Sequence, residues 1–584
     1  MRRISNYDKR PIVSVKGYDQ SAVEGYKTIA AVLREKMGKG ILVVECYPGV
    51  DIEDLTSKLK EHIDFDQIIF SDEIAFTGDE ITRIIDEDLT DDRVFGVMTD
   101  YDLEKFYSFE RLVQAKDLVD KSTGSVLIIG VGASLVKLGD VLVYADMARW
   151  EIQQRFRLGK LSNWRMDNKK EDIIKKYKRG YFFDWRIADN YKKKVFNSID
   201  FYLDTNNIEK PIMVNSDGVY AGMKQCSERP FRVVPFFDPG VWGGQWMKEV
   251  CDLDRSKDNY AWCFDCVPEE NSLLLAFGDS ILEMPAINLV FFQTEALLGN
   301  QVKSKFGVEF PIRFDLLDTV GGENLSLQVH PLKTYIQENF GMQYTQDESY
   351  YILDAEKGAS VYLGLKEGIN CEDLANDLKR ASQGEENFPV DKYINNFEAK
   401  KHDHFLIPAG TVHCSGAGTL VLEISATPYI FTFKLWDWNR VGLDGRPRPI
   451  HIDHGLNVIQ FDRTTDWVKE NLVNDIKIIG KGDGFVEEHT GLHPLEFIET
   501  RRHWFDKPVY HNTNGSVNVI NLIEGEEIIV ESPNGSFDPF VVHYAETFIV
   551  PESVGSYTIR PHGKSEGKIT GTLKAYVRVG NGYE

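Results

Sequence analysis

The stretch FLIPAGTVHCSGAG at residues 405–418 decides the fold of the larger part of the chain. Two short apolar runs flank a turn that contains Pro and Gly, which is typical of two strands joined by a tight connection. Similar runs separated by Gly and Pro recur from about residue 228 onward, as in GASVYLGL at 358–365 and GTLVLEISA at 418–426. This spacing predicts a β sandwich or barrel.

The same stretch aligns with FIVPESVGSYTIRP at residues 548–561, which places Pro408 over Pro551. The match predicts a duplicated barrel. In this register His413 falls opposite Ser556, so the second copy lacks a potential metal ligand. We therefore expect a second, metal-free barrel with a structural role.

Two helices interrupt this β-rich pattern. CEDLANDLKRASQ at residues 371–383 predicts a helical insert, and IDHGLNVIQF at 452–461 predicts a helix that closes the first barrel. The region that follows, from about residue 470, is again rich in strand-like runs.

The first 225 residues alternate strand-like and helix-like patterns. ILVVECYPGV at 41–50 precedes the helical DIEDLTSKLKEHI, and the strand-like QIIFS and SVLIIGVG (125–132) follow. This alternation predicts an α/β layer with a parallel sheet. With a length of 584 residues, we expect an α/β domain at 1–225, a catalytic barrel at 226–465 and a second barrel at 466–584.

The run ILVVECYPGVDIEDLTSKL has the strand, turn and helix order of a phosphate-binding P-loop. Where the motif needs Gly-Lys-Ser/Thr, the chain has Asp51-Ile52-Glu53, whose acidic side chains would repel phosphate. Together with the apolar run at 125–136 and the segment 140–155, the region resembles a P-loop nucleoside kinase without a working nucleotide site. We interpret it as a degenerate, pseudokinase-like domain.

The composition limits the classes of partner. Lys plus Arg number 67 and Asp plus Glu number 91, a formal net charge of −24, so nonspecific nucleic-acid binding is not expected. Seven cysteines, sparse and odd in number, indicate a reducing cytoplasm rather than a disulfide framework. The N-terminal residues lack the apolar run of a signal peptide, and the apolar run at 125–136 is shorter than the roughly 20 residues of a membrane span, so we expect no membrane association.

Two further features have mainly structural interpretations. Residues 155–194 hold 14 Lys plus Arg, which we interpret as a solvated helical face or a remnant of a kinase lid rather than a binding patch for phosphate or RNA. Cys263 and Cys266 form a single CxxC without a second pair, so we assign them a structural role.

Ligand-type side chains follow one another at informative spacings. In LSLQVH (325–330), strand alternation places Ser326, Gln328 and His330 on one face. Glu348 and then His413 follow along the chain. Two imidazoles, a carboxylate and an amide oxygen suit a divalent transition metal, with room for water or substrate. Zinc is the first expectation, and iron or manganese remain alternatives.

This combination of motifs resembles the metal site of class I mannose-6-phosphate isomerases, which are cupin-type enzymes. The similar stretches are WGG (242–244), LSLQVHP (325–331), ESYYILDAEKGASVYLGLK (348–366), FLIPAGTVH (405–413) and DWNR (437–440). They lie within roughly the last 60% of the chain. The resemblance implies jelly-roll cupin barrels, one zinc ion per chain bound by Gln328, His330, Glu348 and His413, and a catalytic role for Arg440.

The resemblance also implies that the chain interconverts mannose 6-phosphate and fructose 6-phosphate through an enediol intermediate, with a small sugar phosphate as its partner. Arg440 suits the developing oxyanion or the phosphate, and a surface ion pair with Asp437 is the structural alternative. Glu423 is a candidate proton carrier or a structural residue. His402 and His404 are expected to be exposed or beside the site rather than ligands.

Two departures from the family pattern leave other functions open. Gln346 stands where the family commonly has Lys, and Phe431-Thr-Phe-Lys434 replaces a Thr-Tyr-Arg stretch. A weak or inactive cupin that binds a sugar phosphate as a regulatory or sensing protein is the first alternative. A metal-dependent cupin oxygenase is another.

Overall fold

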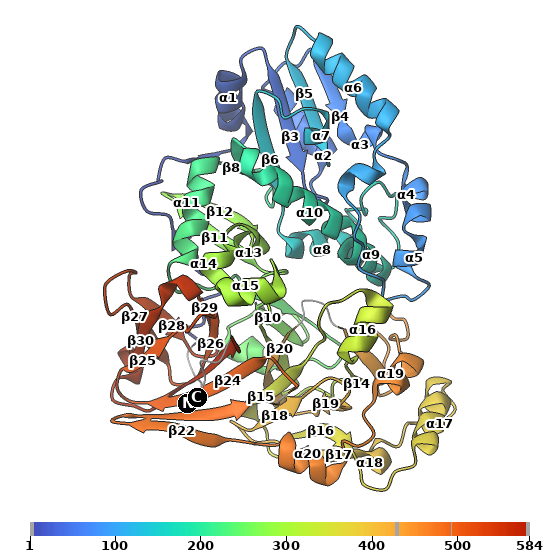
Figure 1. Cartoon of the computed structure of the whole chain (residues 1–584), viewed down its shortest axis with the longest axis vertical. Helices are drawn as coiled ribbons and strands as arrows, with labels where there is room; N and C mark the ends of the chain where they lie inside the picture. Colours follow the sequence, from blue (N-terminus) through green and yellow to red (C-terminus); the bar gives the residue numbers. More distant parts are fainter. Residues whose placement is uncertain (1–4, 427–430, 492, 494, 580–584) are drawn as a thin grey trace.

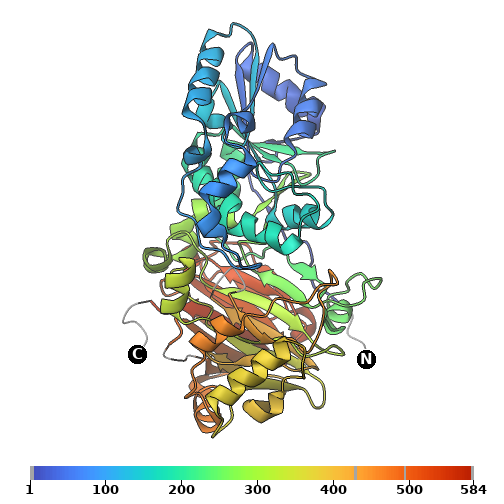
Figure 2. The same ribbon diagram turned by 90° about the vertical axis from the view of Figure 1, so that its right-hand side faces the viewer.

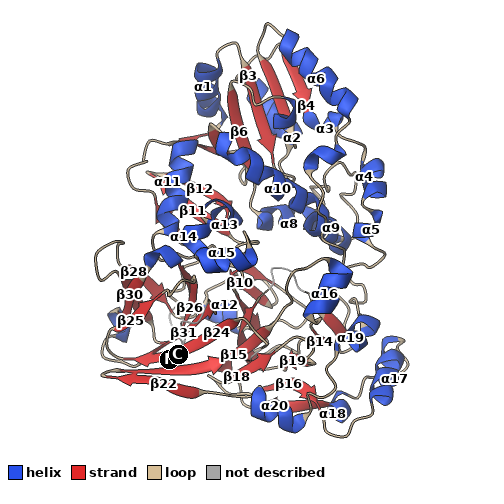
Figure 3. Ribbon diagram, in the orientation of Figure 1, coloured by secondary structure: helices blue, strands red, loops and turns tan. Residues whose placement is uncertain are grey.

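The computed structural model describes residues 5–426, 431–491, 493 and 495–579, so residues 1–4 and 580–584 of the predicted first and last domains lie outside the described residues. An α/β unit lies at the top of Figure 1, and two strand-rich units lie side by side below it. Figure 3 shows that most helices belong to the upper part. We call residues 22–227 the N-terminal α/β unit, 236–436 the first β unit and 477–577 the second β unit.

The N-terminal α/β unit is built on a seven-stranded sheet in the order β2-β8-β7-β6-β3-β5-β4. Its strands are β2 (Ala22–Glu24), β3 (Ile41–Cys46), β4 (Gln67–Phe70), β5 (Val126–Gly130), β6 (Val141–Asp146), β7 (Phe201–Asp204) and β8 (Ile212–Asn215). The five strands from β4 to β7 are parallel, and β8 and β2 join antiparallel at one edge. The predicted α/β layer with a parallel sheet is confirmed.

Helices cover both faces of this sheet, as Figure 2 shows. They include α1 (Tyr26–Met37), α2 (Ile52–Lys60), α6 (Phe109–Lys121) and α11 (Ser216–Ser227). Because both faces are covered, β5 and β6 are buried along their whole length and read as continuous apolar runs. No helix in the described part of the chain is long and apolar enough to cross a membrane.

The basic stretch at 155–194 is partly internal. It spans the end of α8 (Arg149–Arg157), then α9 (Ile173–Arg179), the π-helical turn η2 (Gly180–Asp184) and α10 (Trp185–Val195). Lys176, Lys178, Arg179 and Lys192 are buried. Lys176 Nζ donates to Leu161 O at 2.6 Å, and Lys192 Nζ lies 2.8 Å from Asp146 Oδ2. The interpretation as a solvated face is wrong for these four cations, because carbonyls and carboxylates compensate their charge inside the unit.

The first β unit contains two large sheets, and its strands β11 (Ser272–Phe277) and β12 (Ser280–Pro285) form a smaller third sheet with β1 (Ile12–Ser14). A six-stranded sheet has the order β18-β15-β20-β13-β10-β9, and a five-stranded sheet has the order β17-β16-β19-β14-β21. The first contains β9 (Phe236–Asp238), β10 (Trp262–Cys266), β13 (Arg313–Asp318), β15 (Glu348–Ala355), β18 (His404–Ile407) and β20 (Thr419–Ser425). The second contains β14 (Leu327–Val329), β16 (Ser360–Leu365), β17 (Ile394–Glu398), β19 (His413–Ser415) and β21 (Phe433–Trp436).

Both predicted helices of this region are present. The insert at 371–383 forms α17 (Cys371–Ser382), which begins where the Asn370 side chain accepts hydrogen bonds from the backbone of Glu372 and Asp373. The helix predicted at 452–461 is shorter and forms α19 (Ile452–Val458).

The second β unit has the same plan. Its sheets have the orders β22-β23-β24-β31-β26-β29 and β25-β30-β27-β28. The strands are β22 (Lys477–Gly482), β23 (Phe485–Gly491), β24 (Ile498–Phe505), β25 (Val509–Asn512), β26 (Asn518–Glu524), β27 (Glu527–Glu531), β28 (Phe540–His543), β29 (Thr547–Val550), β30 (Ser556–Pro561) and β31 (Thr570–Val577).

The two β units match strand by strand. The run β18-β15-β20-β13 corresponds to β29-β26-β31-β24, and β17-β16-β19-β14 corresponds to β28-β27-β30-β25. Glu348 pairs with Ile407, the residue before Pro408, and Asn518 pairs with Val550, the residue before Pro551. This agreement supports the duplication and the alignment of the two prolines. In the second β unit Asn518 therefore takes the place of Glu348, and Ser556 that of His413.

Candidate metal centre

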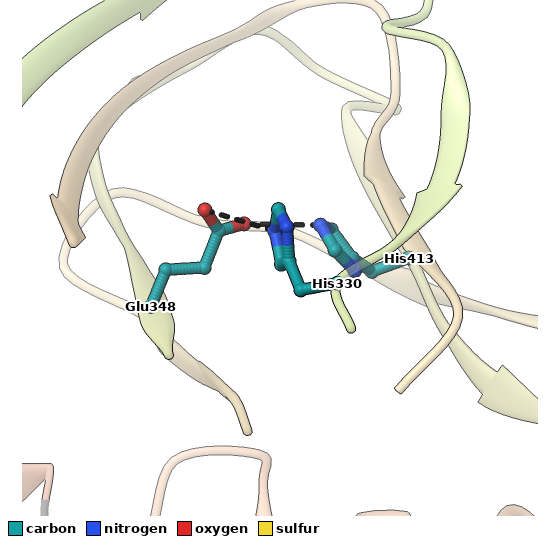
Figure 4. Close-up of side chains that lie close together, drawn as sticks. All are labelled: His330, Glu348 and His413. Carbon is teal, nitrogen blue, oxygen red and sulfur yellow. Dashed lines mark ion pairs between the residues drawn. The ribbon is translucent and has the colours of Figure 1, made fainter. Parts of the chain in front are cut away.

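Three side chains from separate strands converge inside the first β unit. His330 follows β14, Glu348 opens β15 and His413 opens β19. His330 Nε2 lies 3.2 Å from Glu348 Oε2, and His413 Nε2 lies 3.0 Å from Glu348 Oε1. Figure 4 shows the carboxylate of Glu348 pointing toward both imidazoles. All three are buried, and their ligand atoms lie within 4.8 Å of one another, so they could hold a metal ion.

Local structure sets the positions of the two histidines. Strand pairing places Gln328 of β14 opposite His413 of β19. The turn before His413 contains Gly410 with φ +88°, where a Cβ would lie 2.7 Å from Gln460 Cγ. The Gly410 amide donates to His330 O at 2.9 Å, which ties the turn to the first histidine.

Backbone carbonyls orient both imidazole rings. His330 Nδ1 lies 2.9 Å from Phe431 O, and His413 Nδ1 lies 2.8 Å from Thr411 O. A carbonyl can only accept, so each Nδ1 carries the proton and each Nε2 is directed at the cluster. This is the arrangement that metal-binding histidines use.

The cluster fits a divalent cation on its own chemistry. Within the described residues, His330 Nε2 and Glu348 Oε1 are buried without a hydrogen bond of good geometry. Buried polar atoms of this kind need a partner, and a cation would supply it. Gln328 joins the set, because its amide nitrogen lies 3.3 Å from His413 Nε2 and the amide can equally present its oxygen. The structure thus brings all four predicted ligands together.

The electrostatics favour a carboxylate anion at the centre. Burial would raise the pKa of Glu348, but His330 and then His413 outweigh burial and hold this pKa well below its usual range. Burial would lower the pKa of His330, but the negative charge of Glu348 outweighs burial and raises this pKa. Burial dominates for His413 and lowers its pKa. Glu348 is therefore ionised at neutral pH and available as a ligand.

Gln346, the departure from the family pattern, supports Glu348. Its Nε2 donates to Glu348 Oε2 at 2.9 Å, and its Oε1 accepts from the Phe431 amide at 3.1 Å. The sequence comparison identified the substitution but not this bridging role, because Phe431 is 85 positions away along the chain.

Two further carboxyl groups lie beside the cluster. In the sheet, Glu423 pairs with Asp315 on one side and with Tyr350 on the other. Burial, followed by the charge of Glu348, raises the pKa of Glu423 well above its usual range. The pKa of Asp315 is raised in the same way, first by burial. The proton-carrier candidate Glu423 is thus a buried carboxyl group whose pKa is shifted toward the protonated form.

Arg440 lies apart from the three converging residues. Its Nη2 lies 2.6 Å from Asp437 Oδ1, and its Nη1 donates to Asn324 O at 2.6 Å. The ion pair with Asp437 that we considered at the sequence level is present, but the expectation that it lies on the surface is wrong, since the two side chains are only 10% and 3% exposed. The surrounding chain therefore covers most of this pair.

Two other cations accompany Arg440 in a cluster that the sequence reasoning did not assemble. Arg448 Nη1 lies 2.9 Å from Asp437 Oδ2, and Lys434 pairs with Gln328 across the sheet. Burial, followed by the charge of Arg448, lowers the pKa of Lys434 to about 7. In the sequence, the stretch Phe431–Lys434 could have indicated this cluster, because Lys434 stands where the family has Arg. We call Lys434, Arg440 and Arg448 the cationic cluster.

The remaining sequence-level candidates lie outside the metal cluster. Cys263 and Cys266 are buried in β10, consistent with a structural role. His402 is half-buried and contacts Tyr351. His404 is fully buried, so of the two alternatives offered for it, exposure is excluded, and neither histidine belongs to the described His/Glu/His cluster. The ring of His404 packs against Gly491 of the second β unit, because β18 lies at the boundary between the two units.

The P-loop-like turn is covered by a neighbouring helix. Gly49 has φ +129°, and a Cβ there would lie 2.7 Å from Ile152 Cγ1 of α8. Asp51, which stands in the place of a phosphate-binding residue, caps α2 by accepting a hydrogen bond from the Asp54 amide.

Comparisons with known proteins divide the chain in two. A family model described as "Domain of unknown function (DUF8485)" matches residues 25–228. Mannose-6-phosphate isomerase ManA of Bacillus subtilis is 29% identical over 235 residues, which are 40% of this chain and 68% of that protein. The probable mannose-6-phosphate isomerase GmuF of the same organism is 30% identical over 232 residues, 39% of this chain and 68% of that protein.

Solved structures give a weaker match. The crystal structure of the mannose 6-phosphate isomerase from Bacillus subtilis covers 60% of this chain and 100% of its own, with 19% identity and a TM-score of 0.49. A mannose 6-phosphate isomerase structure described as bound with zinc and yttrium covers the same shares with 14% identity and a TM-score of 0.45.

The fold and the site define a two-sheet β protein whose buried His/Glu/His cluster could hold a metal, preceded by an α/β unit. The chain belongs to the mannose-6-phosphate isomerase family, since it spans about two thirds of relatives to which it is up to 30% identical. It is accordingly an isomerase enzyme.

Proposed function

We propose that the chain interconverts mannose 6-phosphate and fructose 6-phosphate through an enediol intermediate. The observation that carries this proposal is the convergence of His330, Glu348 and His413, with both Nε2 atoms directed at one buried carboxylate. The names of the relatives ManA and GmuF supply the substrate. Bound zinc would act as a Lewis acid at the sugar oxygens on which negative charge develops.

Gln328, His330, Glu348 and His413 would hold one zinc ion per chain. The carbonyls of Phe431 and Thr411 fix the protonated Nδ1 atoms, so both Nε2 lone pairs are presented without a change of tautomer. The low pKa of Glu348 supplies the negative charge that a divalent cation needs.

The cationic cluster would bind the phosphate group. Lys434 lies next to Gln328 in the sheet, so a sugar held at the metal ligands would have its charged end within reach of this cluster. Arg440 and Arg448 share Asp437, which holds the two guanidinium groups in place. Guanidinium groups suit phosphate because they donate two parallel hydrogen bonds.

Glu423 would hold the transferable proton. Isomerisation moves a proton between C1 and C2, so the carrier must take a proton from one carbon as a carboxylate and return it to the other as the acid, and a raised pKa makes the carboxylate the stronger base. The position of Glu423 beside Glu348 and its raised pKa support this role.

The deciding experiment is a coupled assay of mannose 6-phosphate conversion on metal-analysed protein, before and after chelation and zinc readdition. We expect activity that is lost on chelation and restored by zinc. Arg440→Ala should lower kcat/KM about 10- to 100-fold, as expected when a charge-assisted hydrogen bond to the phosphate is removed. Arg446→Ala is the matched control, because Arg446 lies nearby with a side chain that is 60% exposed.

A regulatory protein that binds a sugar phosphate without turnover is the alternative. The neutral Gln346 beside Glu348, where the family commonly has a basic residue, favours it. Metal bound without turnover of any hexose phosphate would refute the isomerase proposal and support this alternative.

We also propose that residues 1–225 form a degenerate P-loop-kinase-like domain, followed by cupin-type barrels at 226–465 and 466–584, the second of them metal-free. The packing of Ile152 against Gly49 and the capping role of Asp51 support the loss of phosphate binding. Asn518 and Ser556 in the positions of Glu348 and His413 support the loss of the metal site in the second barrel.

A further inference from the structure

We propose that the N-terminal α/β unit positions the metal ligands of the first β unit, with Phe95 and Phe182 as positioning residues that act through Phe431. This inference rests on the proposed metal centre. It gives the N-terminal unit a part in the site, although that unit contributes none of the four ligands.

The main chain of Phe431 is hydrogen-bonded to one metal ligand directly and to a second one through Gln346. Its carbonyl accepts from His330 Nδ1 at 2.9 Å. Its amide donates to Gln346 Oε1 at 3.1 Å, and Gln346 Nε2 donates to Glu348 Oε2 at 2.9 Å. A displacement of this one residue would therefore disturb an imidazole and the carboxylate together.

The side chain of Phe431 packs against the N-terminal unit. Phe95 stacks on it with ring centroids 5.2 Å apart and an interplanar angle of 20°. Phe182 meets it edge-on at 6.1 Å and 88°. Phe340 of the first β unit packs on it as well, at 5.0 Å. Phe95 and Phe182 are 1% and 0% exposed, so both rings are enclosed at this boundary.

Specific contacts hold Phe95 in this position. The side chain of Asp92 accepts from the Phe95 amide at 2.8 Å and lies 3.4 Å from His451 Nε2. Arg93 lies 2.9 Å from Asp444, and the Met98 amide donates to Phe340 O at 3.0 Å. The segment is therefore bonded on both sides of Phe95, to Asp444 and His451, which follow the first β unit, and to Phe340 of that unit.

A turn of helix positions Phe182. It lies in the π-helical turn η2 between α9 and α10, a conformation that often occurs at functional sites. Two independent segments of the N-terminal unit thus converge on one residue of the first β unit. Aromatic pairs of this geometry stabilise beyond the area that they bury, so the arrangement resists displacement of Phe431.

Cobalt binding to the full-length chain tests the inference without relying on activity. Cobalt titrates the same ligand set, and its d–d absorption reports coordination geometry. We expect Phe95→Ala to weaken cobalt affinity about 10- to 100-fold, the range seen when outer partners of ligands are lost, and to change the band shape. Phe106→Ala is the matched control, because Phe106 is equally buried but packs on Phe183 and Trp164 within the N-terminal unit.

Wild-type cobalt affinity and band shape in folded Phe95→Ala would overturn the inference. Equal weakening in Phe106→Ala would overturn it too, since that result would indicate a general loss of stability. If Phe95→Ala does not fold, Phe95→Leu and Phe182→Leu decide the question, with a smaller weakening expected. For an active enzyme, kcat should fall with KM little changed.

The cobalt-binding test of this inference can fail or succeed independently of the assay that tests the proposed function. A wild-type chain that binds cobalt but does not isomerise any hexose phosphate would refute the isomerase proposal. The comparison of Phe95→Ala with Phe106→Ala would still decide whether the N-terminal unit positions the ligands.

Discussion

Single residues of the first β unit owe their chemistry to burial and to neighbouring charges. Glu348 and Glu423 lie in adjacent strands, yet the histidines lower the pKa of Glu348, whereas burial raises that of Glu423. Two carboxyl groups whose pKa values are shifted in opposite directions can divide ligand and proton-transfer roles between them. This division of roles depends on where each carboxyl group lies relative to the two histidines.

His413→Ala should reduce bound zinc from about one per chain to near zero. The substitution removes one nitrogen and leaves the charge of Glu348 without one of its two imidazole partners. Metal analysis of the dialysed protein measures this change. Ser556→Ala is the matched control, because Ser556 takes the place of His413 in the second β unit, and it should leave zinc content unchanged. Full zinc occupancy in His413→Ala would contradict the assignment.

At the scale of elements, α8, α9 and α10 use their cations to hold the N-terminal unit together. Lys178 Nζ donates to Leu89 O at 2.6 Å, and Arg149 lies 3.0 Å from Asp189. These helices also carry the turn that presents Phe182. The buried cations of these helices therefore contribute to internal structure.

Lys176→Met should destabilise the N-terminal unit by about 1–3 kcal/mol, because it leaves the partly buried Leu161 carbonyl without its donor. Thermal unfolding followed by circular dichroism measures the loss. Lys175→Met, one position away and exposed, should change stability by no more than about 0.5 kcal/mol. Equal effects of the two substitutions would argue against the internal role of Lys176.

At the scale of the whole molecule, the boundaries between units are closely packed. Arg232 donates to Thr547 O at 3.1 Å and lies 2.9 Å from Glu546, and β1 (Ile12–Ser14) pairs with β11 (Ser272–Phe277). His404 lies between the two β units, where burial and then Arg502 lower its pKa to about 3. Protonation of this histidine therefore opposes the packing of the units.

Acid should destabilise the boundary at His404. The unfolded chain binds this proton below about pH 6.5, whereas the folded chain excludes it until about pH 3, so stability falls as the pH drops between these values. At pH 5 the loss is about 2 kcal/mol, which follows from roughly 1.5 pH units at 1.36 kcal/mol each.

His404→Leu lacks this titration and should show a smaller drop in unfolding temperature between pH 7 and pH 5 than the wild type. Differential scanning calorimetry at the two pH values measures the difference. An identical drop in both proteins would contradict the role assigned to His404.

The sequence by itself determined the local elements and the candidate ligands. Burial on both faces makes β5 and β6 continuous apolar runs, and the turn before His413 requires Gly at position 410. Both features can therefore be predicted from neighbouring residues in the sequence. Strand alternation likewise placed Gln328 and His330 on one face. Such signals depend on residues only a few positions apart.

The raised pKa of Glu423, the burial of Lys176 and the contact of Phe95 with Phe431 emerge only in the folded chain. Phe95 and Phe431 are separated by more than half of the chain, and desolvation depends on which distant segments cover a group. A local pattern contains none of these three features, because the first two arise when a unit folds and the third arises only when two units pack against one another.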